Sequence, residues 1–320
     1  MSKNIETYPK VLPTTKTFTT LFMYQQYRDK LNIELDFLNK EISAMEKERR
    51  LIDMGKSKIE WCNETYNPVV GCSPISAGCD NCYAKAMNKR FFGGDFSVKY
   101  HPDRLEEPLK RTKSTLYFVC SMGDLFHIQV RYEWIKKIID VIDQCPQHHF
   151  MFLTKRPDKM KQFFDIMMGK HIPLINAPKD TSYKPLKNLW LGVTAENQEQ
   201  ADKRIPILLE IPAAGYFVSL EPLLEPIKLN SKKWLDYCEY PHCDYYCGSD
   251  GDENYICSGK HVENHLNFVI GGPETGSKSR PMKDEWIDNI EEQCDDADIP
   301  FFHKKDKERQ QVPRELKKFF

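Results

Sequence analysis

The sequence lacks a long apolar run, a signal-like leader and an excess of charge of one sign. No stretch of its 320 residues approaches 18 consecutive apolar side chains, so we expect no membrane-spanning helix. The leading segment, MSKNIETYPK, contains no apolar core, so we expect a cytoplasmic rather than a secreted protein. The 46 basic and 47 acidic residues nearly cancel, which argues against nucleic-acid binding over the whole surface, because such binding needs a basic footprint.

What the sequence does contain is cysteine, with 11 residues in all. An odd number of cysteines in a chain that is not expected to be secreted indicates a reducing compartment, where thiolates are available for metal binding or chemistry. Seven of them form two groups, and four stand alone: Cys62, Cys120, Cys145 and Cys294. Two of these four lie in apolar or amphipathic runs and are expected to be buried thiols.

The first 57 residues differ from the rest of the chain and predict a helical extension. Between Tyr24 and Arg50, apolar residues recur at steps of three and four, as on one face of a helix. They are Leu31, Leu35, Leu38, Ile42 and Met45. Because this stripe is narrow, we expect the helix to dock on the main domain or on a partner. The chain therefore divides into an extension over 1–57 and a main domain over 58–320, which carries a cysteine-rich insertion over 234–265.

From Ile59 onward, short apolar runs alternate with amphipathic helical patterns. The runs, typical of strands buried on both faces, are Tyr66–Gly71, Thr115–Ser121, His149–Thr154, Leu189–Thr194, Gly215–Leu220, Asn267–Gly272 and Ile299–His303. The helical patterns cover Tyr132–Gln144, Pro157–Met168, Gln198–Leu209 and Glu285–Cys294. This alternation predicts parallel β/α units. Six or seven units indicate an α/β fold, a complete or partial (β/α) barrel, with a doubly wound sheet as the alternative.

Polar residues directly follow almost every expected strand. In chain order they are Cys72, Ser121 with Asp124, Lys155-Arg156, Glu196-Asn197, Glu221, Glu274 and Lys304-Lys305. Because the carboxyl ends of parallel strands converge on one face, where active sites are assembled, these residues predict an enzyme-like rim. The alternative is that they are polar only because loops generally are.

The first cysteine group, Cys72, Cys79 and Cys82, has the spacing C-x6-C-x2-C and follows the first expected strand. Three thiolates leave a four-coordinate centre one ligand short, and no histidine lies within the loop. A 4Fe–4S cluster held by three cysteines would keep one iron open for substrate or cofactor, and we favour this interpretation. The alternatives are a zinc site completed by a distant residue and a redox-active CxxC pair, although the latter leaves Cys72 unexplained.

The three-cysteine loop and its CxxCYA ending resemble the radical S-adenosylmethionine (SAM) superfamily, and most closely its spore-photoproduct-lyase-like branch. More specifically, the chain resembles a phage- and bacteria-associated family of radical-SAM-like proteins of unknown function. The matching motifs span about residues 58–305 and are IEW, YNP, GCSPISAGCDNCYA, SMGDLF, LTKRP, LGVTAEN, SLEPLL, GGPETG, RPM and PFF. The first spacing is longer than in the best-known loop of that superfamily, C-x3-C-x2-C.

This resemblance implies that Cys72, Cys79 and Cys82 hold a 4Fe–4S cluster whose open iron binds SAM, which is cleaved reductively to a 5′-deoxyadenosyl radical. It also implies cofactor-binding roles for residues of the matching motifs, beginning with Tyr83 in the CxxCYA ending. Ser121 and Asp124 would bind the methionine ammonium of SAM, and Lys155 and Arg156 its carboxylate or a substrate phosphate. Glu196 or Glu221 would bind the ribose, and Gly271 and Gly272 would approach adenine, with Glu274 beside them. Simpler structural roles are the alternatives. Asp124 would cap a helix, Lys155-Arg156 would be a solvated helix start, and Glu221 would form a salt bridge in a turn.

The second cysteine group lies in the insertion and has the spacing C-x4-C-x3-C-x9-C. Its members are Cys238, Cys243, Cys247 and Cys257, with His242, His261 and His265 as possible substitutes. Four thiolates are enough for a closed zinc site, and metal binding would order a segment that has few apolar residues. We favour Zn²⁺ here; an auxiliary iron–sulfur cluster and unliganded thiols are the alternatives.

Together these features predict a radical SAM enzyme that depends on an external electron donor. The branch resemblance favours a nucleic-acid base or a nucleotide as substrate, for modification or repair. A polymeric substrate would need a local basic groove, for which the candidates are Lys89, Arg90, Lys99, Arg104 and Lys110–Lys113. The competing hypothesis is a non-catalytic zinc-binding interaction protein that recruits a partner through its N-terminal helix.

Overall fold

The structure is a computed structural model that describes residues 25, 27–42, 59–170, 184–229, 234–235, 264–276 and 278–319. Contacts divide the chain into two units, Met1–Gly55 and Lys56–Phe320, which are described separately. In the first unit, residues 27–42 are helical, and their apolar side chains, including Leu31, Leu35 and Leu38, are exposed. The four cysteines of the second group lie outside the described residues, so the zinc prediction stays a prediction.

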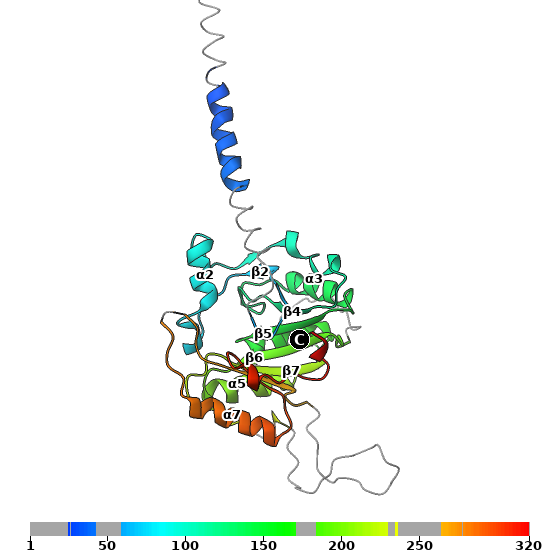
Figure 1. Ribbon diagram of the computed structural model, residues 1–320. Helices are drawn as coiled ribbons and strands as arrows, with labels where there is room; N and C mark the ends of the chain where they lie inside the picture. The colour runs from blue at the N-terminus through cyan, green and yellow to red at the C-terminus, as the bar shows by residue number, and fades with distance from the viewer. Residues whose placement is uncertain are drawn as a thin grey trace, which may run out of the picture. The chain divides into compact units, whose positions relative to one another are not determined.

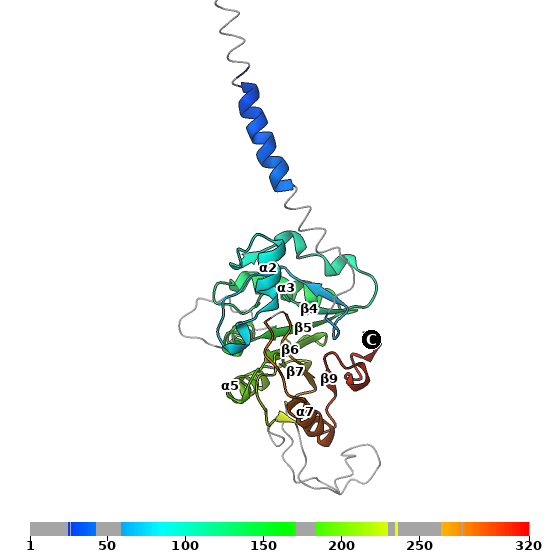
Figure 2. The ribbon, with the colours of Figure 1, turned by 60° about the vertical axis from the view of Figure 1, so that its left-hand side comes forward.

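A seven-stranded parallel sheet forms the centre of the second unit. Its strands are β1 (Glu64–Tyr66), β4 (Leu116–Val119), β5 (His149–Thr154), β6 (Leu189–Thr194), β7 (Gly215–Leu220), β8 (Phe268–Gly271) and β9 (Phe301–His303). They pair in the order β1-β4-β5-β6-β7-β8-β9, and every pair is parallel. In a doubly wound sheet the chain order of the strands would reverse part-way across the sheet, whereas here it runs in one direction from edge to edge. The sheet instead curls into a half-barrel, so the prediction of a partial (β/α) barrel is confirmed (Figures 1 and 2).

The connections between strands carry helices, four of which the 3.6-residue periodicity predicts and one of which, α2, it did not. The described helices of this unit are α2 (Tyr83–Phe91), α3 (Tyr132–Asp143), α4 (Pro157–Met167), α5 (Gln198–Leu209) and α7 (Asp284–Asp296). A separate two-stranded antiparallel sheet pairs β2 (Val69–Val70) with β3 (Lys99–Tyr100). The sequence predicted one strand over Tyr66–Gly71, whereas the structure divides this segment between β1 and β2, since Asn67-Pro68 interrupts it.

The core has two parts, because successive side chains of each strand point to opposite faces of the sheet. Val119, Phe152 and Val193 pack with the buried residues of the helices on the convex face. Phe118, Met151 and other alternate residues pack on the other, concave face, in a cluster that includes no residue of a described α-helix. There the space is filled from outside the sheet, by Trp61, Leu316 and Phe319.

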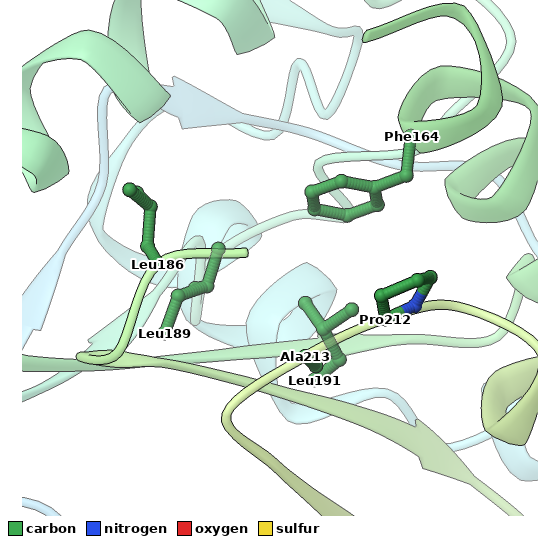
Figure 3. A pocket seen from close by; sticks show the side chains of 6 residues that line it. All are labelled: Phe164, Leu186, Leu189, Leu191, Pro212 and Ala213. Carbon is green, nitrogen blue, oxygen red and sulfur yellow. The ribbon is translucent and has the colours of Figure 1, made fainter. Parts of the chain in front are cut away.

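A small apolar depression of about 140 Å³ lies at the amino-terminal end of β6 (Figure 3). It is lined by Phe164, Leu186, Leu189, Leu191, Pro212 and Ala213. These side chains carry no polar group that could orient a ligand. The depression also lies at the opposite end of the strands from the polar residues that follow them, so we do not regard it as a substrate site.

We expect the stability of the fold to fall as the pH drops from about 6.5 to about 4. Burial, together with the charge of Lys318, lowers the pKa of His149 to about 4. The folded protein therefore keeps this imidazole neutral over a range in which the unfolded chain, with a histidine pKa of about 6.5, takes up a proton. A His149→Gln variant should flatten the decline of the urea midpoint between pH 6.5 and pH 4. Parallel declines in the two proteins would contradict this assignment.

Candidate functional site

The three cysteines of the first group lie on a loop that runs from the end of β2 to the start of α2. Cys72 follows Gly71, Cys79 is the last residue of a short 3₁₀ turn, and Cys82 immediately precedes α2. All three thiols are free and partly exposed. In contrast, the four solitary cysteines are free and buried, which confirms the expectation for buried thiols among them. Only the loop cysteines among the described residues are therefore accessible to a ligand.

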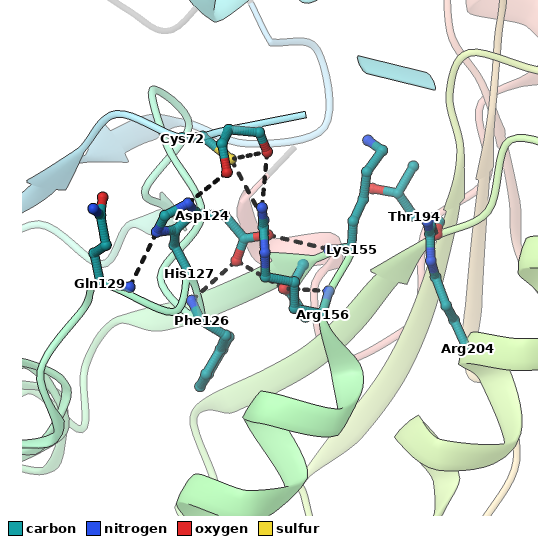
Figure 4. A network of polar contacts seen from close by, with 11 residues as sticks. Cys72, Asp124, Phe126, His127, Gln129, Lys155, Arg156, Thr194 and Arg204 are labelled. Carbon is teal, nitrogen blue, oxygen red and sulfur yellow. Dashed lines mark hydrogen bonds and ion pairs between the residues drawn. The ribbon is translucent and has the colours of Figure 1, made fainter. Parts of the chain in front are cut away.

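Arg156, at the carboxyl end of β5, contacts the beginning of this loop (Figure 4). Its Nη1 donates to the Cys72 Sγ at 3.4 Å, and its Nη2 donates to the Ser73 carbonyl oxygen at 2.8 Å. Burial raises the pKa of the Cys72 thiol, and the Asp124 carboxylate adds to this, whereas Arg156 opposes it. Arg156 therefore lies beside a candidate ligand and is buried, so it is not a solvated helix start; its role in binding a carboxylate or a phosphate stays a prediction.

Asp124 orients Arg156. Its Oδ2 lies 2.7 Å from the Arg156 Nη1, and its Oδ1 accepts hydrogen bonds from the Thr154 hydroxyl and the Phe126 amide. Both carboxylate oxygens are thus bonded to protein groups in a nearly solvent-free position. The alternative that Asp124 caps a helix does not describe these contacts, since its partners are the Phe126 and Lys155 amides and the Thr154 and Arg156 side chains. A direct role in binding the SAM ammonium stays a proposal.

His127 also holds the loop, and no sequence motif pointed to it. The Gln129 amide donates to its Nδ1 at 3.2 Å, so the neutral ring carries its proton on Nε2, which lies 2.7 Å from the Ser73 hydroxyl (Figure 4). Burial, together with the charge of Arg156, lowers the pKa of His127, which favours this neutral form. Only the SMGDLF segment directly before it could have drawn attention to this histidine.

The middle and the end of the loop contact residues that follow β6 and β8. The Gly78 amide donates to the Glu196 carboxylate at 3.2 Å, and Glu196 is fully buried in an ion pair with Arg204 of α5. Glu274 lies 2.6 Å from Arg280, whose hydrogen bonds, with a smaller contribution from Asn81, lower the pKa of Glu274 to about 2. The resemblance implied Glu196 or Glu221 for a ribose and Glu274 beside adenine. In the structure both carboxylates contact the cysteine loop.

Tyr83 and Ser121 connect α2 to the end of β4. The Tyr83 hydroxyl donates to the Ser121 carbonyl oxygen at 2.5 Å, and the Ser121 hydroxyl donates to the Asn67 side chain at 3.2 Å. These bonds place the first turn of α2, and with it Cys82, next to the carboxyl end of β4. Cofactor-binding roles for Tyr83 and Ser121 stay predictions.

Two basic side chains lie at the rim of the half-barrel in different environments. The Lys155 ammonium has no hydrogen-bond or ion-pair partner among the described residues, and its side chain points away from Arg156 (Figure 4). Lys304 forms an ion pair with Glu221, so the alternative of a salt bridge for Glu221 agrees with the structure. Lys155 is therefore the better candidate for binding an anionic group of a ligand.

Gly271 and Gly272 allow close packing within the protein itself. A Cβ on Gly271 would lie 2.6 Å from a methyl carbon of Ile287, and one on Gly272 would lie 2.8 Å from the Lys304 Cβ. These contacts with α7 and β9 already account for glycine at both positions. An approach to adenine is an additional proposal.

The prediction that Arg104 contributes to a basic groove is wrong. This side chain is buried and donates to the Asn67 carbonyl oxygen, so it does not belong to the surface. Lys99 and Arg111 form ion pairs with Asp95 and Glu64. Three of the proposed cations are thus already bonded to protein groups.

The loop carries a suitable set of donors for a metal cluster, although its thiols are not gathered around a centre. Within the described residues, no three His, Cys, Asp or Glu side chains are grouped as metal ligands would be. The chemistry nevertheless fits a cluster with three thiolate ligands: three partly exposed cysteines share one loop, and no other described cysteine is accessible. Cluster binding would require the three Sγ atoms to come together within this loop.

The fold and the loop define a class of protein: a parallel β/α half-barrel with a three-cysteine loop at the carboxyl ends of its strands. The chain belongs to the family DUF5131, described as "Protein of unknown function", whose model matches residues 56–318. No curated protein matches the sequence. Neither the family description nor the similar structures mention a phage, so that association stays a prediction.

The similar solved structures are spore photoproduct lyases. A cysteine-to-serine variant is 14% identical, with a TM-score of 0.37, over 52% of this chain and 47% of the enzyme. The enzyme complexed with dinucleoside spore photoproduct is 14% identical, with a TM-score of 0.38, over 54% of this chain and 49% of the enzyme. A further variant, with bound AdoMet and dinucleoside spore photoproduct, is 14% identical, with a TM-score of 0.36. The chain spans about half of these enzymes, and at such TM-scores nothing about its activity is taken from them.

No helix in the described part of the chain combines the length and hydropathy that crossing a lipid bilayer requires.

Proposed function

We propose that this protein is a radical SAM enzyme whose cluster is held by Cys72, Cys79 and Cys82. The observation that carries this proposal is the distribution of accessible thiols. The three cysteines of one loop are partly exposed at the carboxyl ends of the half-barrel strands, while the other described cysteines are buried. Active sites of parallel β/α folds are built at this end of the strands.

When bound, a 4Fe–4S cluster with an open iron would supply the electron for reductive cleavage of SAM, drawn from an external donor. The residues of the chain would bind and orient the cofactors. Arg156 donates to the Cys72 sulfur, and hydrogen bonds to ligand sulfurs are one of the ways in which a protein tunes a cluster. The partly buried Lys155 ammonium would bind a carboxylate or phosphate at the same rim.

We further propose a nucleic-acid base or a nucleotide as the substrate class. Support comes from Lys155, whose charge acts on the buried Glu196 but whose ammonium forms no ion pair among the described residues, so it can bind an anionic group. The surface cations offer less support for a long polymer, since Arg104 is buried and Lys99 and Arg111 are paired. A mononucleotide or a single extruded base therefore fits the described residues better than an extended duplex.

Anaerobic reconstitution with iron and sulfide tests the cluster. We expect a brown protein with broad visible absorption, and we expect a Cys79→Ala variant to lose the iron and sulfide that depend on this loop. Cys145→Ala, which changes a buried and uninvolved thiol, is the matched control and should keep the wild-type metal content. A colourless wild-type protein that binds only zinc would reject this function and favour a zinc-binding interaction protein.

The reaction class is tested by adding SAM and a reductant to the reconstituted protein and measuring 5′-deoxyadenosine. Product is expected with the wild type and the Cys145→Ala control, and none with Cys79→Ala. A protein that holds a cluster but forms no 5′-deoxyadenosine would keep the cluster assignment and overturn the radical mechanism.

A further inference from the structure

We infer that Glu274 and Arg280 form a clamp that positions the second half of the cysteine loop. The clamp consists of these two residues after β8, and it holds Ala77, Asp80 and Asn81. As a device for positioning cluster ligands it rests on the proposed function. As a device for ordering the loop it depends only on the contacts.

The clamp begins with a rigid ion pair. The Arg280 Nη2 lies 2.6 Å from the Glu274 Oε1, and the Arg280 Nε donates to Oε2 at 3.0 Å. The Arg280 amide donates to the same Oε2 at 2.8 Å, which closes a short ring between backbone and carboxylate. Two parallel bonds between guanidinium and carboxylate fix the plane of the guanidinium. Arg280 therefore presents its remaining donors in a defined direction.

Those remaining donors reach the cysteine loop. The Arg280 Nη2 donates to the Ala77 carbonyl oxygen at 2.8 Å, and Nη1 donates to the Asp80 Oδ2 at 3.2 Å. The Asn81 side chain donates to the Glu274 Oε2 and to the Lys278 carbonyl oxygen, both at 2.9 Å. All three loop residues are within two positions of Cys79, and Asn81 directly precedes Cys82. The clamp thus acts on the segment that contains two of the three candidate ligands.

Gly78 provides a second attachment of the same segment, at β6. Its amide donates to Glu196, and a Cβ on Gly78 would come within 3.0 Å of the Glu196 Cδ, so the loop backbone lies directly against this carboxylate. Ala77 and Gly78 belong to the six residues between Cys72 and Cys79, a spacing three residues longer than that of the better-known loop. A longer loop loses more conformational entropy when it is ordered. The clamp and Glu196 offset this loss by holding the additional residues.

The shape of the guanidinium explains why arginine is needed at position 280. It bonds to a carboxylate, a loop carbonyl and a second acidic side chain at once, from one planar group. A lysine ammonium is a single compact charge and cannot reproduce this fork. An Arg280→Lys variant should therefore keep the positive charge but lose the order of the loop.

Hydrogen–deuterium exchange of the full-length protein without added metal tests the clamp. In Arg280→Gln, the peptide covering 75–82 should exchange about tenfold faster than in the wild type, which corresponds to about 1.4 kcal/mol of local stability at 25 °C. Asn81→Ala, which removes fewer bonds, should give a smaller increase in the same peptide. The peptide covering α3 should be unchanged in both variants. An exchange rate of the 75–82 peptide within twofold of wild type in Arg280→Gln would overturn the clamp.

Arg309→Gln is the matched control, because Arg309 also bridges two carboxylates, Asp288 and Glu291, but contacts no residue of the cysteine loop. It should leave exchange of the 75–82 peptide at the wild-type rate. In reconstituted protein, Arg280→Gln should lose iron to a chelator several-fold faster than Arg309→Gln. Faster exchange in a protein that binds no cluster would keep the clamp and reject the proposed function. Unchanged exchange and unchanged iron loss in an Arg280→Gln protein that binds a cluster would reject the clamp and keep the proposed function.

Discussion

Replacement of Arg204 by methionine is expected to lower the free energy of unfolding by about 3–5 kcal/mol. The Arg204 Nη1 lies 2.9 Å from Glu196 and donates to the Thr194 carbonyl oxygen at 2.7 Å. The two charged side chains are 3% and 0% exposed, so Glu196 would be left as a buried carboxylate without its cation. The loss is a large fraction of the roughly 5–15 kcal/mol by which a typical domain is stable. Urea unfolding followed by circular dichroism measures it.

An exposed pair provides the control for this prediction. Lys136 and Asp140 are four residues apart on α3, and their side chains are 33% and 49% exposed, so Lys136→Met should change stability by at most about 0.5 kcal/mol. Adding Glu196→Gln to Arg204→Met removes the stranded charge and should restore part of the loss. If Arg204→Met were no more destabilising than Lys136→Met, the pair would not contribute to the fold as the structure implies.

Gly71→Ala is expected to destabilise the protein by about 2–4 kcal/mol and to displace Cys72. Gly71 has a φ of +89°, and a Cβ there would lie 2.0 Å from the Ser97 carbonyl oxygen, which belongs to the backbone and cannot rotate away. The Gly71 amide also donates to the Met122 carbonyl oxygen, which holds the start of the cysteine loop beside β4. Unfolding experiments measure the loss of stability, and iron content after reconstitution measures the displacement.

Gly93→Ala separates the two causes of that effect. Gly93 has a similar φ of +81°, but a Cβ there meets no atom within 4 Å. Its variant should therefore show only the backbone strain, about 1 kcal/mol, and should keep its iron. Equal losses in the two variants would mean that the close approach of Gly71 to Ser97 is unimportant.

The regular elements of the half-barrel were predictable because their residues carry a local pattern. Leu189–Thr194 and Gly215–Leu220 are continuous apolar runs, and both form strands with the predicted bounds. Gln198–Leu209 has the periodicity of a helix that covers such strands, and it forms α5. Where a strand-breaking pair interrupts a run, as Asn67-Pro68 does, the pattern no longer specifies a single strand, and the prediction was wrong in detail.

The contacts at the candidate site were less predictable, because they join residues that are distant in the sequence. Asn81 and Glu274 are 193 positions apart, and no local pattern relates them. Arg280 appeared only as part of a short motif, and His127 appeared in none. Their importance follows from the side chains that they meet, and those are brought together only when the strands close into the half-barrel.

The sequence by itself determined the class of fold and the position of the cysteine loop after the segment 66–71, which the structure divides between β1 and β2. Both follow from local information: buried strands need continuous apolar residues, and parallel strands direct the residues that follow them toward one end of the sheet. The tertiary structure alone decided which groups the polar residues that follow the strands contact. Glu196, Glu274 and Asp124 each form an ion pair with an arginine, because a charge moved out of water must find a partner close by. Which partner is near depends on how the whole sheet curls.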